Sequence, residues 1–380
     1  MRKNKYLIVG VNAAGFCAIE TIRRLDPNSE ITAVNGEEYL PYKRTKINKL
    51  FSENKLDVKN FLLAPPEWYE ENSIRLLTGL MVMSINKAKR EVCLNNGEIL
   101  KWDKLLLSLG ADSCKPEGSE FNEAISIRSY EDALKIVPLI ESGCNVVVYG
   151  LGLEAIETAC QLKSAGLKVT LAGRGNTLLS RYFSGDLVAL IKKNLAKEGV
   201  SVEYGIQSVD ISKLPYDCLV YSTGISPRID LARSGGIVTR KGIVVNERME
   251  TSDGDIYAAG DCAEVKAGVI TDHWHAAQDQ GRTAGENMTG GDVVWPQKKY
   301  RLKTELFGDF FFSMRPFKYD QTADLDSEIS ILPDRAFRQF YYRADRLEGV
   351  EVAGDRERAK LYEEAVNRGW SRGEVMKRLG

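Results

Sequence analysis

The feature that most constrains the fold of this chain is a pattern that occurs twice, about 140 positions apart. The segments KYLIVGVNAAGFCAIETIRRLDPNSEITAV (5–34) and CNVVVYGLGLEAIETACQLKSAGLKVTLA (144–172) share an apolar run, a glycine-rich turn, apolar residues at helical spacing and a second apolar run. Continuous apolar runs are typical of parallel strands that are covered on both faces. Each segment therefore predicts a strand, a tight turn, a helix and a second strand, and the chain predicts an α/β protein.

The two turns indicate nucleotide binding. The first reads GVNAAG (10–15), with Asn where a middle Gly is usual, and the second reads GLGLEA (150–155). Small residues let the backbone approach a pyrophosphate, and the helix N-terminus stabilises its charge. One such turn is weak evidence, because tight strand-to-helix turns favour glycine anyway. Two in the same frame predict two dinucleotide sites, at Gly10, Asn12, Ala13, Ala14 and Gly15, and at Gly150, Gly152 and Ala155.

Two dinucleotides in one chain make chemical sense when a nicotinamide reduces a flavin, because the hydride passes directly between the two rings. The bulk properties agree with such an enzyme. A chain of 380 residues with 43% hydrophobic and 28% charged residues predicts a globular protein of two or three domains. A net charge of −1 favours neither nucleic acid nor an anionic membrane as a partner.

The seven cysteines are scattered, with no metal-ligand or C-x-x-C spacing, and the chain has two histidines. An odd number of cysteines argues against a secreted disulfide framework. We therefore expect no structural metal site and a cytoplasmic protein. No apolar run is long enough to span a bilayer.

Four further segments carry a family resemblance. TSDGDIYAAGDCAE (251–264) resembles the second flavin motif of the FAD-dependent pyridine nucleotide-disulfide oxidoreductase superfamily. KLLLSLGA (104–111), STGISPR (222–228) and WHAAQDQGRTAGENMTG (274–290) resemble its crossover segment, return segment and closing helix. With LPYKR (40–44) added to these segments, the chain most resembles the single-flavin reductases of the NADH:rubredoxin oxidoreductase and nitrite reductase flavoprotein type. The resemblance covers about residues 5–350.

The resemblance implies two Rossmann-like domains and a small α+β interface domain. The FAD domain would comprise residues 1–112 and 227–296, the NAD(P) domain 113–226 and the C-terminal interface domain 297–380. Within the last domain, FRQFYYRADRLEGVEVAGD predicts two strands joined by a charged turn. The tail predicts two short helices, the second opened by a capping box of Ser371 and Glu374. Interface domains of this kind often mediate dimers, so a homodimer is left open.

The resemblance also assigns residues. It implies that Lys49 lies near flavin N5 and that Glu157 pairs with it, which makes these two the expected catalytic residues. A Lys⁺ there stabilises negative charge on the reduced ring, and its carboxylate partner limits the cost of burying it. The other expected cofactor contacts are Glu37 (adenosine ribose), Arg44 (phosphates or ribityl chain), Val82 (adenine, through its backbone), Asp261 (ribityl hydroxyls), and Gly110 and Gly224 in the crossover and return segments.

One departure from the family pattern concerns the choice of coenzyme. In VTLAGR (169–174), Gly173 stands where NADH enzymes usually carry Glu, whose carboxylate binds the 2′-hydroxyl and repels a 2′-phosphate. Without that acid, Arg174 could pair with the phosphate of NADPH. The alternatives are that Arg174 only covers the surface, or that nicotinamide binding is impaired. The coenzyme is therefore written NAD(P)H.

A second departure concerns thiols. The disulfide reductases of the superfamily carry a C-x4-C or C-x-x-C pair, and this chain has neither. The NADH oxidases, peroxidases and CoA-disulfide reductases place one cysteine in the region that reads YLPYKRTKINKLF here (39–51), where no cysteine occurs. We therefore expect electrons to leave directly from FAD to a small redox protein, rubredoxin or ferredoxin. One alternative is an NAD(P)H oxidase or a disulfide reductase that uses Cys17 or Cys262. Another is a flavin-containing subunit or redox-sensing module with weak nicotinamide turnover. In the same stretch, Lys43 and Lys46 are expected to be solvated, or to form a docking rim for an acidic protein.

Overall fold

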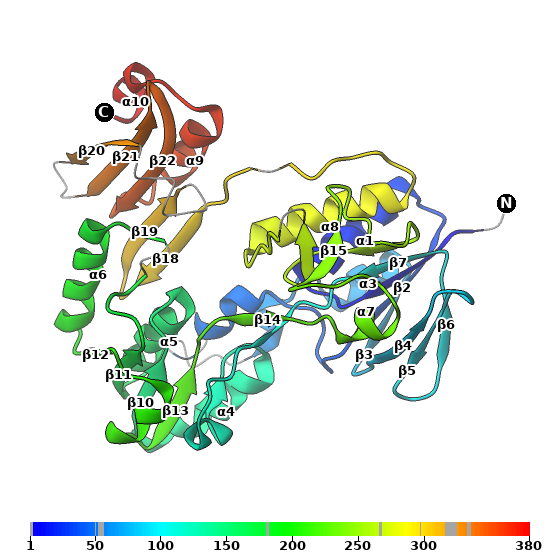
Figure 1. Cartoon of the computed structure of the whole chain (residues 1–380), viewed down its shortest axis with the longest axis horizontal. Helices are drawn as coiled ribbons and strands as arrows, with labels where there is room; N and C mark the ends of the chain where they lie inside the picture. Colours follow the sequence, from blue (N-terminus) through cyan, green and yellow to red (C-terminus); the bar gives the residue numbers. More distant parts are fainter. Residues whose placement is uncertain are drawn as a thin grey trace. The chain divides into compact units, whose positions relative to one another are not determined.

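The computed structural model describes residues 3–49, 51, 57–179, 182–265, 268–296, 298–315, 325–332 and 336–380. The chain forms two compact units, which Figure 1 shows coloured along the sequence. Unit 1 comprises residues 1–47, 57–113 and 225–296, and unit 2 comprises residues 48–56, 114–224 and 297–380. No helix in the described ranges is long and apolar enough to cross a lipid bilayer.

Unit 1 is built on a five-stranded parallel sheet in the order β16-β7-β1-β2-β3. Its apolar runs form the central strands, and Leu105, Leu106 and Leu107 of β7 are fully buried. The strand order changes direction at β1, and ligands of open α/β sheets bind at the carboxyl ends of the strands beside such a point. The strands are β1 (Lys5–Val9), β2 (Glu30–Asn35), β3 (Ile74–Thr78), β7 (Lys104–Leu107) and β16 (Ile256–Ala258).

Two helices of unit 1, α1 (Ala13–Leu25) and α8 (Trp274–Met288), pack closely against each other. A Cβ on Gly281 would lie 2.1 Å from the carbonyl oxygen of Ala14, and a Cβ on Gly285 would lie 2.9 Å from that of Ala18. These successive contacts mean that the helices run in the same direction. Their N-termini therefore lie at the same end of the unit, where the first glycine-rich turn enters α1.

Smaller elements complete unit 1. A three-stranded antiparallel sheet precedes β7, and the antiparallel pair β8–β14 flanks the segment that belongs to unit 2. The smaller elements of unit 1 are β4 (Val82–Asn86), β5 (Glu91–Leu94), β6 (Ile99–Lys101), β8 (Ala111–Ser113), β14 (Ile225–Pro227), β15 (Ile243–Val245), β17 (Ala263–Val265), α3 (Pro66–Glu71), α7 (Asp230–Ser234) and η2 (Val58–Phe61). The short helix η1 (Arg44–Lys49) begins in unit 1 and ends in unit 2.

Unit 2 contains a second five-stranded parallel sheet, in the order β12-β11-β10-β13-β9, so the repeated strand–turn–helix–strand pattern is confirmed. Its central strand β10 leads through the second glycine-rich turn into α5. The strands are β9 (Ile125–Ser126), β10 (Asn145–Tyr149), β11 (Lys168–Gly173), β12 (Ser201–Tyr204) and β13 (Cys218–Tyr221). The helices are α4 (Tyr130–Ser142), α5 (Leu153–Ser164), α6 (Gly185–Lys197), η3 (Ser119–Asn122) and η4 (Ser208–Lys213).

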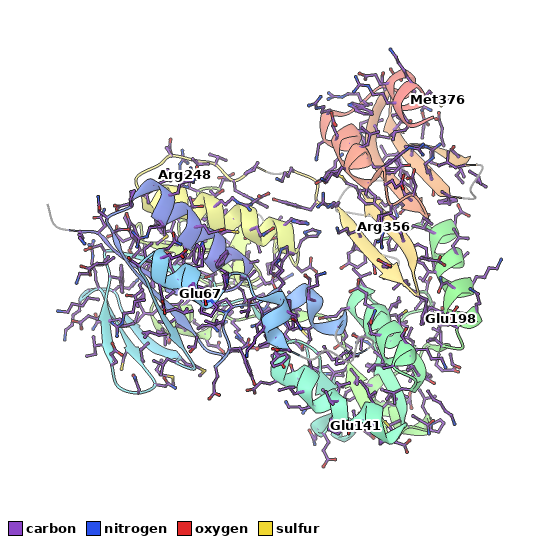
Figure 2. All side chains as sticks on the ribbon, turned by 180° about the vertical axis from the view of Figure 1, so that it is seen from behind. Glu67, Glu141, Glu198, Arg248, Arg356 and Met376 are labelled. Carbon is purple, nitrogen blue, oxygen red and sulfur yellow. The ribbon has the colours of Figure 1, made fainter. Side chains whose placement is uncertain are left out.

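The C-terminal part of unit 2 is an antiparallel sheet in the order β18-β19-β22-β21-β20. The predicted pair β21–β22 and the capping box of Ser371 and Glu374 are both confirmed. Both C-terminal helices contribute to the core under the sheet, while Met376 on α10 is 69% exposed and points outward (Figure 2). The elements are β18 (Leu302–Leu306), β19 (Asp309–Met314), β20 (Asp326–Ile331), β21 (Phe337–Arg343), β22 (Arg346–Ala353), α9 (Ala359–Arg368) and α10 (Arg372–Leu379).

A buried charge joins this sheet to the parallel-sheet part of unit 2. Glu351 is fully buried and accepts hydrogen bonds from the Ser184 N–H (2.9 Å), from Arg315 (2.9 Å) and from the hydroxyl of Tyr341 (3.1 Å). Burial raises the pKa of Glu351, and Arg315 opposes that shift. Ser184 is the N-cap residue of α6, so its hydrogen bond to Glu351 connects the C-terminal sheet to that helix. Removal of one partner from the cluster would leave a buried charge uncompensated. The three-domain division remains our proposal for how the units are subdivided.

Candidate functional site

The first glycine-rich turn is shaped by close backbone approaches. Gly10 has φ +93°, and a Cβ there would lie 2.3 Å from the carbonyl oxygen of Ser108. A Cβ on Gly15 would lie 2.1 Å from the carbonyl oxygen of Gly10. The hydroxyl of Ser108 donates to that same oxygen (2.6 Å). Both glycines are therefore needed to bring the start of α1 against the end of β1.

The N-terminus of α1 is prepared for an anion. Asn12 is the N-cap residue, but its side chain makes no capping hydrogen bond, and its Oδ1 instead accepts from Nε of Arg44 (2.9 Å). Ala13 and Ala14 follow as buried residues of the first turn. The helix N-terminus and the Arg44 guanidinium both favour negative charge, so this turn fits a pyrophosphate.

An acid completes the group at this end of the sheet. Arg44 pairs with Oε1 of Glu37, and the hydroxyl of Tyr42 donates to Oε2 of Glu37 (2.5 Å). The guanidinium carbon of Arg44 lies 5.3 Å from the centre of the Tyr42 ring. The structure thus joins Asn12, Arg44 and Glu37, and adds Tyr42, which sequence analysis missed. The motif LPYKR carries Tyr42, but the sequence does not show that its hydroxyl reaches Glu37.

The second flavin motif lies at the same place. Gly260 has φ +82°, and a Cβ there would lie 3.3 Å from Cβ of Ala14 and 3.6 Å from Cβ of Ala277. The fully buried Gln280, also missed by sequence analysis, accepts the Gly260 N–H (2.7 Å). The turn that carries the half-buried Asp261 is therefore held beside the first turns of both α1 and α8.

Two further predicted FAD contacts lie nearby in the fold. Gly110 follows β7 with φ +70°, and no atom lies within 4 Å of a Cβ placed on it. Val82 begins β4, and its neighbour Met81 contacts the segment before Glu37, because a Cβ on Gly36 would lie 3.6 Å from Met81 Cγ. Both positions fit a bound dinucleotide, and their contacts remain predictions.

The second glycine-rich turn, in unit 2, has the same construction. Gly150 has φ +151°, and a Cβ there would lie 2.1 Å from the carbonyl oxygen of Ser222 and 3.0 Å from Cβ of Ala155. Gly152 is the N-cap of α5, makes no side-chain cap and has open space around its Cβ position. Gly224, after β13, also has open surroundings and a φ of +108°. The N-terminus of α5 is therefore accessible to a second dinucleotide.

The position predicted to select the coenzyme, Gly173, lies against the side chain of Leu151. A Cβ on Gly173 would lie 2.8 Å from Cγ of Leu151, so the Leu151 side chain occupies the space that an acid at position 173 would need. Arg174, the next residue, is exposed. Leu151 belongs to the glycine-rich turn, and sequence analysis gave it no role, because its contact with β11 depends on the folded turn.

Of the two expected catalytic residues, the structure describes the side chain of Glu157 but only the backbone of Lys49. Glu157 lies on α5, where its Oε1 accepts a hydrogen bond from the hydroxyl of Thr304 (2.6 Å). Lys49 ends η1, and its backbone belongs to the same unit as Glu157. Its side chain lies outside the described residues, so the pairing of Lys49 with Glu157 stays a prediction. Lys43 and Lys46 are exposed, as expected for solvated side chains.

The cysteines of the thiol alternative are buried. Cys17 is 3% exposed and Cys262 is fully buried, where its thiol donates to the carbonyl oxygen of Leu107 (3.4 Å). Burial raises the pKa of each thiol to about 11. Because the thiolate is the nucleophile, neither residue is prepared to act in a thiol relay at neutral pH.

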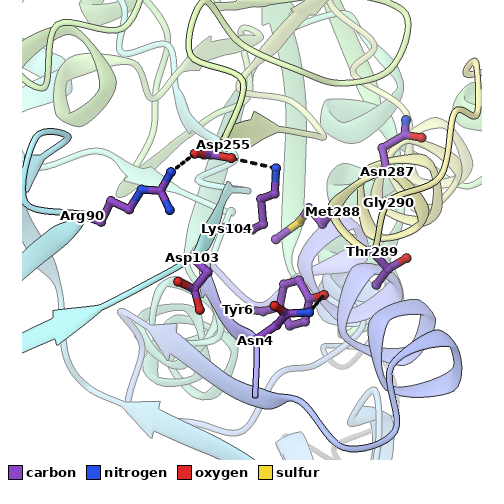
Figure 3. A pocket seen from close by; sticks show the side chains of 10 residues that line it. All are labelled: Asn4, Tyr6, Arg90, Asp103, Lys104, Asp255, Asn287, Met288, Thr289 and Gly290. Carbon is purple, nitrogen blue, oxygen red and sulfur yellow. Dashed lines mark hydrogen bonds and ion pairs between the residues drawn. The ribbon is translucent and has the colours of Figure 1, made fainter. Parts of the chain in front are cut away.

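A polar cavity of about 490 Å³ in unit 1 is not the cofactor site. Residues at the amino ends of β1 and β7 line it, at the opposite end of the strands from the glycine-rich turn. Figure 3 shows Asp255 between Arg90 and Lys104, paired with both, and its bond from Lys104 measures 2.7 Å. The two cations of the lining, Arg90 and Lys104, are matched in number by two acids, Asp103 and Asp255.

Comparisons with known proteins decide the family. Residues 4–281 match the family described as pyridine nucleotide-disulphide oxidoreductase. The chain belongs to this family. It is 31% identical to an NADH-rubredoxin oxidoreductase of Clostridium acetobutylicum over 78% of each chain, and 30% identical to an NADH oxidase of Methanocaldococcus jannaschii over 75% of this chain and 70% of that protein.

A solved structure, that of NADH:rubredoxin oxidoreductase from Clostridium acetobutylicum, has a TM-score of 0.82 with this chain at 27% identity, and the match covers 97% of this chain and 96% of that one. The predicted α/β fold and the oxidoreductase class are confirmed by these matches. FAD and a nicotinamide dinucleotide are the cofactors of this family, as the paired turns predict.

Proposed function

We propose that this protein is an NAD(P)H-dependent flavoprotein reductase that passes electrons through FAD to a small redox protein, rubredoxin or ferredoxin. The observation that carries the proposal is the likeness to an NADH:rubredoxin oxidoreductase structure along almost the whole chain, C-terminal sheet included. The two open glycine-rich turns support it, because a reductase of this kind needs one for each dinucleotide.

The FAD would be held in unit 1 by the residues at the carboxyl ends of its strands. The N-terminus of α1 and Arg44 would bind the pyrophosphate, Glu37 the ribose hydroxyls and Asp261 the ribityl chain. Bound there, FAD supplies a ring that accepts a hydride and can release electrons singly. The remaining contacts would come from Gly10, Asn12, Ala13, Ala14, Gly15, Val82 and Gly110.

The nicotinamide coenzyme would be held in unit 2. The turn from Gly150 to Ala155 would bind its pyrophosphate at the N-terminus of α5, with Gly224 after β13 and Arg174 after β11 lining the same edge. Lys49 would sit near flavin N5 with Glu157 as its acidic partner. No side chain needs to act as acid or base in hydride transfer itself, since positioning of the two rings is sufficient.

A second candidate function is oxidation of NAD(P)H by molecular oxygen. The specific observation in its favour is the likeness to an NADH oxidase. The reductase is preferred because both buried thiols have a raised pKa, which disfavours the thiol chemistry of the related oxidases and disulfide reductases. The remaining alternative, a flavin-containing module without turnover, requires that nicotinamide does not reduce the flavin.

An anaerobic titration tests the proposal. The FAD-loaded protein is mixed with NADH and, separately, with NADPH, and the absorbance of the oxidised flavin is followed. We expect prompt bleaching with at least one coenzyme, and absence of bleaching with both would contradict the proposal. Recovery of the colour is then compared after addition of oxidised rubredoxin, oxidised ferredoxin or oxygen. Faster recovery with oxygen than with either protein would favour the oxidase.

We also propose a cytoplasmic setting. All seven cysteines are free thiols. This is the state that a reducing compartment maintains. Fractionation of cells with an antibody against the chain tests this assignment, and recovery of the protein outside the cytoplasm would contradict it.

A further inference from the structure

A side chain of the C-terminal sheet reaches a carboxylate on α5, the helix that follows the second glycine-rich turn. Strand β18 lies against α5 within unit 2 (Figure 1). Thr304 on β18 is 4% exposed, and its hydroxyl donates to Oε1 of Glu157 across 2.6 Å. The two residues are separated by 147 positions, so only the fold brings them together.

Thr304 carries a hydroxyl group at a buried position of the strand, where an apolar side chain is usual. Along β18, exposed residues alternate with the inward-facing Thr304 and Leu306. An inward position in such a strand usually takes an apolar β-branched residue, and Val has nearly the shape of Thr. A buried hydroxyl is costly unless it has a partner, and here the partner is a carboxylate, which gives a stronger hydrogen bond than a neutral acceptor.

Glu157, the partner of Thr304, lies near the N-terminus of α5, where the nicotinamide coenzyme is proposed to bind. Glu157 follows the open Gly152 N-terminus of α5 by about one and a half turns. Glu154, three residues earlier, is held separately, because the hydroxyl of Ser222 donates to its Oε2 (3.1 Å). The parallel sheet therefore orients one acid of α5, and the C-terminal sheet orients the other.

We propose that Thr304 is a positioning residue for flavin reduction: its hydroxyl fixes the carboxylate of Glu157 at the nicotinamide end of the proposed site. This inference rests on the proposed function. It gives the C-terminal domain a role in flavin reduction, in addition to that of an interface. Thr304 acts through Glu157, and its hydroxyl transfers no proton in the reaction.

The test compares Thr304→Val with Thr304→Ser in the FAD-loaded protein. Anaerobic stopped-flow mixing with NAD(P)H measures the limiting rate of flavin bleaching, and calorimetry with the oxidised coenzyme measures its affinity. We expect Thr304→Val to lower the limiting rate roughly three- to tenfold while the affinity changes less than about twofold. Thr304→Ser retains the donor and should restore most of the rate.

A double-mutant cycle separates positioning from general damage. In the Glu157→Gln background, Thr304→Val should cause little further slowing, because the carboxylate that it orients is already gone. Ser313→Ala is the matched control, since Ser313 on the neighbouring strand β19 donates to the carbonyl oxygen of Tyr182 (2.7 Å) and has no part in the proposed site. We expect its bleaching rate to equal that of the unaltered protein.

Three results would overturn the inference while the proposed function stands: an unchanged rate in Thr304→Val, equal slowing with and without Glu157, or the same slowing in Ser313→Ala. A failure of the unaltered protein to bleach with either coenzyme would instead overturn the proposed function, and this inference with it. Thermal unfolding of each variant shows whether a lost rate comes from lost structure. In that case Thr304→Ser would fail to restore the rate.

Discussion

Arg44 donates a hydrogen bond from Nε to Oδ1 of Asn12 across 2.9 Å, and its guanidinium also pairs with the carboxylate of Glu37. The side chain of Asn12 is thereby turned away from the helix that it begins, which leaves the first N–H groups of α1 without a side-chain cap. A cation, an uncapped helix N-terminus and an acid lie within one hydrogen-bonded group. That combination suits the phosphates and ribose of a dinucleotide.

The first prediction follows from this group. We expect Arg44→Met to weaken FAD binding roughly tenfold to a hundredfold, because a charge-assisted hydrogen bond contributes about 1.5–3 kcal/mol. Flavin fluorescence after dilution of the loaded protein measures the dissociation constant. Lys43→Met is the control, since Lys43 is the adjacent, exposed cation. Equal weakening in both variants would show that general charge, and not the position of Arg44, determines FAD binding.

The sequence allowed a correct prediction of the parts of the site that depend on local structure. Both glycine-rich turns, their strands and their helices follow from hydrophobic periodicity and from the steric demands of Gly10 and Gly150. What it could not show are contacts between distant segments. Tyr42 with Glu37, Leu151 over Gly173 and Thr304 with Glu157 all depend on tertiary packing, and none of these residues belongs to a spacing pattern that indicates its partner.

The second prediction concerns stability. Gly281→Ala places a methyl group 2.1 Å from the carbonyl oxygen of Ala14, so α8 must move away from α1. We expect the free energy of unfolding to fall by about 1–3 kcal/mol, the usual cost of overpacking, as measured by urea denaturation. Gly254→Ala is the control, because its Cβ position is open. If both variants unfold at the same urea concentration, the helices tolerate more separation than their packing indicates.

The third prediction concerns thiol chemistry and pH. Burial raises the pKa of Cys17 to about 11, so the thiol stays protonated at neutral pH and forms thiolate only as the pH approaches that value. At neutral pH, iodoacetamide should modify the half-buried Cys93 and Cys114 before Cys17, as mass spectrometry of digested protein would show. We expect Cys17→Ala to keep its electron-transfer rate. A thiolate-to-flavin absorbance band after reduction would contradict this prediction and favour the disulfide-reductase alternative.

The last prediction concerns the choice of coenzyme. Gly173 stands in place of an acid at the end of β11, and the exposed Arg174 beside it can pair with a 2′-phosphate. We expect Arg174→Ala to raise the KM for NADPH about tenfold, with the KM for NADH nearly unchanged, because only NADPH carries the phosphate that the guanidinium pairs with.

The converse change must include Leu151, whose side chain occupies the space beside Gly173. Gly173→Glu alone should impair both coenzymes, because the new side chain meets Cγ of Leu151 at a distance no Cβ tolerates. Gly173→Glu combined with Leu151→Ala and Arg174→Ala should favour NADH, since the carboxylate can then accept from the 2′-hydroxyl and repel the 2′-phosphate. Steady-state kcat/KM for both coenzymes measures the shift. If Arg174→Ala weakens both coenzymes equally, then the arginine contributes only general positive charge and the selectivity is determined elsewhere in unit 2.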